Sequence, residues 1–156
     1  MLLYFTLKYL HVLGAIVLLG TGSGIAFFML MAHRSGDAAY IFRTSQTVVI
    51  ADIIFTATAV VAQPVTGLML ASLIDLPLTQ GWLVLSLTLY VVAGLFWLPV
   101  VWMQMKMRDL AGQAVRDGAP LPAAYRRLFR LWFAFGFPGF GSVAAILWLM
   151  IAKPDL

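Results

Sequence analysis

Four long apolar runs determine what this chain can fold into. Each is about 20 residues or longer, the length that an α-helix needs to cross a bilayer, and short segments with charged residues, Gly or Pro separate them. In lipid, the backbone polar groups of such a run must be paired within the run, so it forms a helix. We expect membrane spans at approximately residues 3–32, 44–73, 82–105 and 128–152.

The composition places the chain in the same class. Hydrophobic residues make up 63% of the chain and charged residues 10%, whereas soluble domains have about 25% charged residues. The 156 residues contain no polar stretch long enough for a second domain, so residues 1–156 are predicted to form one. Short connections favour an all-α, up-down four-helix bundle in the membrane. Cys is absent, which excludes disulfides, iron–sulfur clusters and thiolate metal sites.

The distribution of Lys and Arg predicts the orientation. Eight of the ten basic residues fall in two segments on the same side of the bundle: Arg34, Arg43, Lys106, Arg108, Arg116, Arg126, Arg127 and Arg130. The positive-inside rule places this side in the cytoplasm and both termini outside. We therefore expect a multi-pass protein of a bacterial inner membrane, surrounded by the lipid bilayer. The net charge of +4 arises mainly from the basic residues of these two segments, so it does not indicate a nucleic-acid partner.

His11 is the most informative single residue, because it lies inside the first apolar run. A histidine at membrane depth is costly and tends to be functional. Three interpretations are open at this point. The imidazole is buried and hydrogen-bonded to a neighbour, it is an axial ligand of a b-type haem, or it relays protons or binds a substrate without a metal.

The residues that share the helical face of His11 are mostly small. They are Gly14, Ala15, Leu18 and Gly22. We expect this face to leave room for a flat cofactor or for a closely packed helix. Lys8, one turn earlier, is expected to extend outward or to pair with a haem propionate. Gly20 and Gly24 form a GxxxG pair that favours helix packing, including packing in a homo-oligomer.

A second haem ligand is not evident in the sequence. His33 lies about 33 Å further along the same helix at about 1.5 Å per residue, so it cannot bind the same haem within one subunit. We expect His33 to be an interfacial residue on the cytoplasmic side. Met69 and Met150, near the outer ends of their spans, are candidate axial ligands. A five-coordinate iron, or a haem shared across a dimer, also fits.

Asp52 is the only acid well inside a span. Arg127 and Arg130, at the start of the fourth span, are its expected partners. Two interpretations remain open. Asp52 fixes two helices through an ion pair or a hydrogen bond, or it is a residue through which protons enter.

Three other places depart from a simple apolar helix. Gln63 precedes Pro64 and is expected to form a kink with a polar group in the second span. Gln104 is expected at the cytoplasmic interface. The stretch GFPGFG (Gly136–Gly141) is expected to make the fourth helix irregular. A Ser/His/Asp arrangement, a His/Glu metal cluster and a nucleotide-binding loop are absent from the sequence.

The chain resembles, over nearly its whole length, the DUF2269 family of predicted bacterial integral membrane proteins. The resemblance is carried by LKYLHVLGAIVLLGTGSG (Leu7–Gly24), WLPVVWMQMKMRDLA (Trp97–Ala111) and WLMIAKP (Trp148–Pro154). The first helix is more remotely similar to that of CopD-type copper-resistance proteins and HemJ-type protoporphyrinogen oxidases. Those helices have a Lys-x-x-His motif, matched here by Lys8 and His11. The HemJ resemblance implies haem b at His11.

These observations lead to a functional expectation with two alternatives. The chain is expected to be a membrane protein that binds haem b through His11 and takes part in electron transfer or oxidoreduction. Its partner would be a quinone, a porphyrin or a redox protein. The first alternative is a non-catalytic membrane subunit or assembly partner of a larger complex. The second is a small-ion or proton transporter that uses Asp52, Gln63 and His11.

Overall fold

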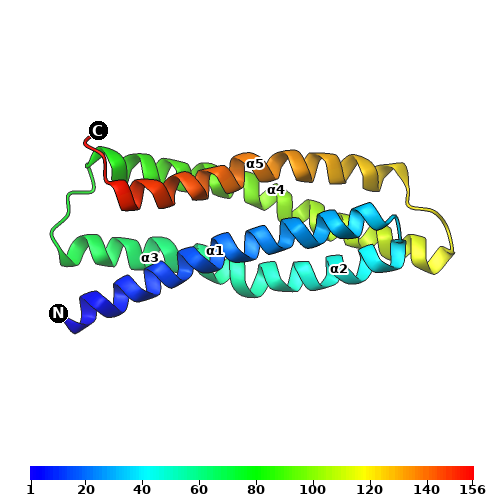
Figure 1. Cartoon of the computed structure of the whole chain (residues 1–156), viewed down its shortest axis with the longest axis horizontal. Helices are drawn as coiled ribbons and strands as arrows, with labels where there is room; N and C mark the ends of the chain where they lie inside the picture. The colour runs from blue at the N-terminus through cyan, green and yellow to red at the C-terminus, as the bar shows by residue number, and fades with distance from the viewer.

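The structure, a computed structural model, describes residues 1–156 and contains only helices, turns and loops (Figure 1). The helices are α1 (Leu2–Ser35), α2 (Ala38–Ala51), the short π-helix η1 (Asp52–Thr56), α3 (Ala57–Leu73), α4 (Gly81–Asp117) and α5 (Ala123–Ala152). Four helical segments are long and apolar enough to cross a membrane: α1, the continuous α2–η1–α3, α4 and α5. The predicted all-α bundle of four membrane helices is therefore confirmed. We call α2–η1–α3 the second span.

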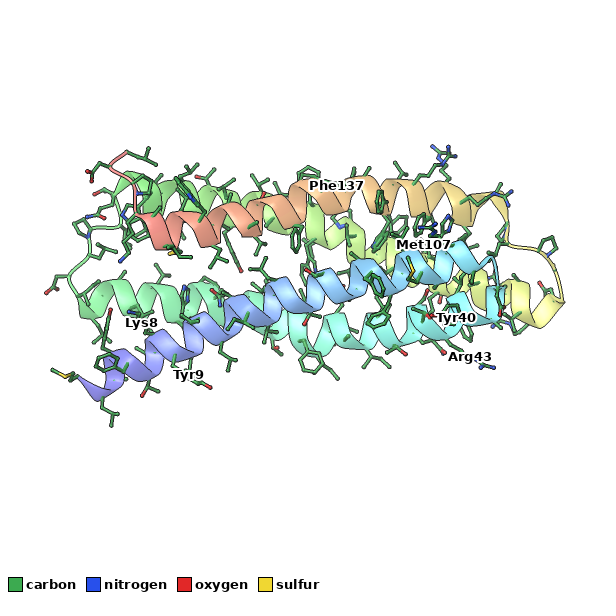
Figure 2. The ribbon with its side chains drawn as sticks, viewed as in Figure 1. Lys8, Tyr9, Tyr40, Arg43, Met107 and Phe137 are labelled. Carbon is green, nitrogen blue, oxygen red and sulfur yellow. The ribbon has the colours of Figure 1, made fainter.

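The two ends of the bundle carry different features. The α1–α2 and α4–α5 turns lie at one end, which we call the basic end because most Lys and Arg residues are there. Both termini and the α3–α4 turn lie at the other end, the termini end (Figure 1). Figure 2 shows Lys8 and Tyr9 toward the termini end, and Tyr40 and Arg43 toward the basic end.

Two helices end at glycines in the left-handed backbone conformation at the basic end. Gly36 follows α1 with a φ of 68°, and Gly118 follows α4 with a φ of 59°. A residue without Cβ takes this conformation at little cost, so glycine stops a helix cleanly. Asp37 then begins α2, because its carboxylate accepts a hydrogen bond from the Ala39 N–H at 2.8 Å. These caps make the connections at this end short.

One helix continues well past its predicted membrane segment. α4 reaches Asp117, beyond the predicted boundary at residue 105. Met107 and Ala111 are fully buried in this extension, so packing against the other helices stabilises it. Figure 2 shows Met107 inside the bundle.

The helical irregularity lies in a different span from the one predicted. α5 runs through Gly136–Gly141 without interruption, with Pro138 inside it, so the predicted irregular segment is wrong. Lipid offers no alternative partners for the backbone, and this keeps glycine-rich helices intact in membranes. The irregular element is η1, where the hydrogen-bond pattern widens to that of a π-helix between Asp52 and Thr56. Such π-segments are rare and occur frequently at functional sites.

The hydrophobic core is concentrated in the half nearer the basic end. Its eleven buried residues come from α1, α2, α4 and α5: Ile25, Met29, Ala32, Ile41, Val48, Met103, Met107, Ala111, Tyr125, Phe129 and Trp132. Toward the termini end, the buried apolar cluster is much smaller and lies on α4 and α5: Trp82, Leu83 and Leu149. There the helices form two pairs, α1 with α3 and α4 with α5 (Figure 1). The bundle is therefore closed at one end and loosely packed at the other.

Candidate functional site

His11 is held at the contact between α1 and α3 by the hydroxyl of Thr66. The Nδ1 atom of His11 lies 2.9 Å from Thr66 Oγ1. Thr66 Oγ1 also donates a hydrogen bond to the Ala62 carbonyl at 2.7 Å. A hydroxyl has a single hydrogen, so Oγ1 acts as the acceptor toward His11, and Nδ1 carries the proton. In the neutral ring, Nε2 then keeps a free lone pair, which can bind a metal or accept a proton.

Gln63, one turn before Thr66 on α3, also joins α3 to α1. Its side-chain Nε2 donates to the His11 carbonyl at 2.7 Å. A Cβ built on Gly14 would overlap this amide, and a Cβ on Gly67 would lie 3.1 Å from Cε1 of His11. Each glycine therefore makes room for a polar side chain of the facing helix. The backbones of α1 and α3 approach closely because both positions lack a side chain.

Neighbouring helices approach the small residues on the face of His11. Gly14 is covered by the Gln63 amide, and a Cβ on Gly22 would contact the Phe140 ring of α5 at 3.8 Å. Leu18, on the same face, is half-buried. The second expectation for this face, a closely packed helix, is therefore what the structure shows at Gly14.

A groove lies on the α1–α3 contact toward the termini end. It has a volume of about 370 Å³ and is lined by Leu3, Leu7, Leu68, Met69, Ser72 and Leu73. Leu7 is one turn before His11 on α1, and Met69 is about one turn after Thr66 on α3. Lys8 is exposed beside this groove, with Nζ 5.8 Å from the centre of the Tyr4 ring. The groove thus begins one turn outward from the His11–Thr66 pair.

A second polar cluster surrounds Asp52, the first residue of η1. Asp52 is only 3% exposed. Trp97 Nε1 of α4 donates to Asp52 Oδ1 at 3.3 Å. The hydrogen-bonding surroundings orient the Gln104 amide with its nitrogen toward Asp52. In this orientation, Gln104 Nε2 donates to Asp52 Oδ2 at 2.9 Å, and its oxygen accepts from Trp132 Nε1 at 3.2 Å. Neutral N–H donors therefore surround the carboxylate.

Two predictions about this cluster are wrong. Asp52 makes no ion pair with Arg127 or Arg130, because the one salt bridge in the structure joins Arg108 to Asp109. Gln104 is not interfacial, since it is 1% exposed. The arginines are exposed near the start of α5, whereas the tryptophan and glutamine side chains fill the interior of the bundle.

Three partners of the buried polar groups were not identified from the sequence. Thr66 holds His11, and Trp97 and Trp132 bond to the Asp52 and Gln104 side chains. Each partner lies on a different helix from the group that it binds. The apolar pattern of the sequence does not show which helix faces meet there.

His33 lies near the basic end and is far from His11, as expected from their separation along α1. Its ring stacks on Phe129 of α5, with centroids 3.6 Å apart and an interplanar angle of 7°. Its Nδ1 lies 3.4 Å from the Tyr125 hydroxyl. The ring contributes to packing between α1 and α5. The structure does not bring the two histidines together.

These features define a multi-pass integral membrane protein with four spans and two separate buried polar sites. The chain matches the family described as "Predicted integral membrane protein (DUF2269)" over residues 5–154 and belongs to this family. The resemblance to this family noted in the sequence is thereby confirmed. No curated protein and no solved structure matches the chain. Membership in this family, with large apolar side chains exposed along the spans, indicates contact with the lipid bilayer.

Proposed function

We propose that the protein binds a b-type haem with Nε2 of His11 as an axial ligand, and that it acts in electron transfer or oxidoreduction. The observation that carries the proposal is the hydrogen-bond chain from His11 through Thr66 to the Ala62 carbonyl. Histidines that bind metals commonly donate their other ring N–H to a neighbouring acceptor, which fixes the tautomer and the ring orientation. The donor chemistry at His11 fits this pattern.

The surroundings of His11 favour the termini side as the place for the haem. The Gly14 and Gly22 side is filled by Gln63 and Phe140, whereas the outward side leads to the apolar groove that includes Leu7 and Met69. The groove is open, since Leu3, Met69 and Leu73 are exposed, so a haem in it would also contact lipid. We place the haem toward this groove. Lys8 then supplies a cation for a propionate, and the Met69 thioether is a candidate second ligand.

A haem supplies one-electron redox chemistry, with a potential set by its axial ligands, hydrogen bonds and burial. In this site, Thr66 holds the His11 ring and tunes the basicity of Nε2. Gln63 holds the backbone of His11 against α3. The redox partner would be a quinone, a porphyrin or another membrane redox protein.

Difference spectra of the purified protein test the proposal. The full chain is produced with added haem precursor, purified in detergent and recorded as dithionite-reduced minus air-oxidised spectra. His33→Ala is the matched control, because His33 is the only other histidine. We expect a Soret band in the wild type and in His33→Ala, and its loss in His11→Ala. A wild type without the band, or a His11→Ala variant that keeps it, would refute the proposal.

A second candidate function is that of an assembly subunit, and one feature of α1 favours it. A Cβ built on Gly20 or on Gly24 would meet no atom within 4 Å. This GxxxG pair therefore has no partner within the chain, and such pairs allow close helix association in membranes. Native electrophoresis of wild type and a Gly20→Leu/Gly24→Leu variant tests this function. A larger species in the wild type that the variant lacks supports it, and identical migration as a monomer contradicts it.

A further inference from the structure

The polar residues of the second span lie on one buried face. Asp52, Thr56 and Thr66 are buried, and Gln63 is half-buried. The opposite face is exposed and apolar, and consists of Ile50, Ile53, Ile54, Phe55, Val61, Val65 and Leu68. Asp52 and Thr66 are separated by about 21 Å along the helix at about 1.5 Å per residue. This distance is about two-thirds of the hydrocarbon thickness of a bilayer, so the polar face crosses most of the membrane.

At one end of this face, Asp52 places an ionisable carboxylate inside the bundle. Packing of the helices does not need an ionisable group at this position. The carboxylate is surrounded by the neutral donors of Trp97 and Gln104, and no Lys, Arg or His nitrogen lies within 4.0 Å of it. An unpaired carboxylate in a membrane interior is costly, and acids in such places mark proton or ion pathways. A haem at His11 does not explain Asp52, because the two sites are in different halves of the bundle.

Two hydroxyl groups lie between Asp52 and His11 along the second span. Thr56 Oγ1, one turn from Asp52, is buried, lies beside the Asp52 carboxylate and makes no other hydrogen bond. The Tyr90 hydroxyl of α4 then donates to the Val60 carbonyl. That carbonyl is free of its usual helical donor because Pro64 has no N–H. A hydroxyl both donates and accepts hydrogen bonds, so each of these groups can pass a proton to a water or side chain beside it.

We propose that this face of the second span is a proton path, with Asp52 as its proton-exchanging acid and His11 as its last group toward the termini end. Asp52 takes up a proton from the basic end as an O–H bond forms on its carboxylate. That O–H bond breaks as Asp52 gives the proton to a water beside Thr56. Thr56 and Tyr90 each gain a proton from one water as their own O–H bond breaks toward the next. Nε2 of His11 accepts the proton and then releases it toward the termini end. No electrons are transferred, and the path needs no haem.

Proton uptake into liposomes tests the path. The full chain is reconstituted into vesicles that contain a pH-sensitive dye and potassium, and valinomycin then creates a membrane potential that is negative inside. Asp109→Asn is the matched control, because Asp109 is half-exposed and lies outside the path. We expect uptake in the wild type and in Asp109→Asn above that of empty vesicles. Asp52→Asn and Thr56→Val should fall to the level of empty vesicles.

Further measurements check that the variants are folded and that the acid itself is needed. Circular dichroism and gel filtration show whether the variants are folded, and Asp52→Glu, which keeps the acid, should restore part of the uptake. A haem-free wild type that matches empty vesicles, or a folded Asp52→Asn variant that conducts like the wild type, would overturn the proposal. Haem spectra of the same samples separate the two hypotheses. Conducting protein without haem contradicts only the haem site. Because a haem iron on Nε2 would occupy the atom that accepts the proton, the path predicts conduction in haem-free protein and none in haem-loaded protein. Conduction that haem loading leaves unchanged, or haem-free protein that does not conduct, contradicts the path.

Discussion

The Tyr90 hydroxyl links the two helix pairs of the termini half, because it donates a hydrogen bond from α4 to the Val60 carbonyl, one turn before Pro64 of α3. In this half, α3 otherwise packs on α1, and α4 packs on α5. Pro64 lacks the N–H that would normally bond to Val60. Tyr90 therefore satisfies a backbone acceptor for which lipid offers no other partner.

Replacing Tyr90 with Phe should destabilise the protein by about 1 kcal/mol, because the Val60 carbonyl loses its donor. The free energy of unfolding, measured by titrating SDS into mixed micelles, checks this. Tyr9→Phe is the control, since Tyr9 is 67% exposed and its replacement should change little. Equal stability of Tyr90→Phe and wild type would contradict the prediction.

The Pro64→Ala background gives a sharper form of the same experiment. The alanine that replaces Pro64 has an N–H that can bond to the Val60 carbonyl within the helix. The cost of Tyr90→Phe should therefore be smaller in Pro64→Ala than in the wild type. An unchanged cost would mean that Tyr90 stabilises the protein by some route other than the carbonyl that Pro64 frees.

Gly14→Ala should destabilise the protein by about 1 kcal/mol, because the Gln63 amide must move and lose its hydrogen bond, whereas Gly20→Ala should be almost neutral. The Cβ at residue 14 would overlap the Gln63 amide, which is held by its hydrogen bond to the His11 carbonyl. This amide is the far end of a flexible side chain, so the cost is mainly that of the lost hydrogen bond. The Cβ at residue 20 meets nothing within the chain. Thermal denaturation of the monomeric protein in detergent compares the two, and similar melting temperatures would argue against close α1–α3 packing.

Thr66→Val should weaken haem retention if His11 is the ligand. The change removes the acceptor that holds Nδ1–H, and the loss of such a partner typically lowers metal affinity by about 10–100-fold. Thr66→Ser keeps a hydroxyl and should retain haem. Thr58→Val is the control, because Thr58 lies outside this contact and its hydroxyl bonds to its own helix. Haem content per protein after extensive washing measures the effect, and equal content in Thr66→Val and wild type would count against the assigned tautomer.

Gln104→Leu should destabilise the bundle by about 1–3 kcal/mol, because both Asp52 and the Trp132 indole N–H lose a buried partner. Asp52→Asn/Gln104→Leu should lose less than the sum of the two single changes, since they remove one shared interaction. Gln113→Leu, at an exposed position of α4, is the control. Chemical unfolding followed by tryptophan fluorescence gives the free energies. Additive effects would place Gln104 outside the Asp52 cluster.

The fold could be predicted from the sequence because a membrane imposes a simple length rule. Apolar runs long enough to cross the bilayer form helices there, and four such helices are present. The continuation of α4 to Asp117 was not predictable in this way. It depends on the burial of Met107 and Ala111 against other helices, which hydropathy along one segment does not describe.

The partners of the polar residues were harder to predict than the residues themselves. His11, Asp52 and Gln63 are conspicuous because they are polar within apolar runs. Their partners depend on the rotation of each helix about its axis, and lipid-facing and protein-facing sides are both apolar in a membrane. One signal was available for Thr66, which follows Gln63 by three residues on the same helical face. The positions of Trp97 and Gln104 had no such signal.

The uneven packing of the bundle has a consequence for its dynamics. Local opening is easiest where few apolar contacts are buried. In this protein, such places lie together at one end of the bundle and are spread over several helices. Amide hydrogen exchange should therefore vary with depth in the membrane. Met29 and Met107, far apart in sequence but in one core, should exchange slowly together. Leu10, at the loosely packed end of the same helix as Met29, should exchange much sooner.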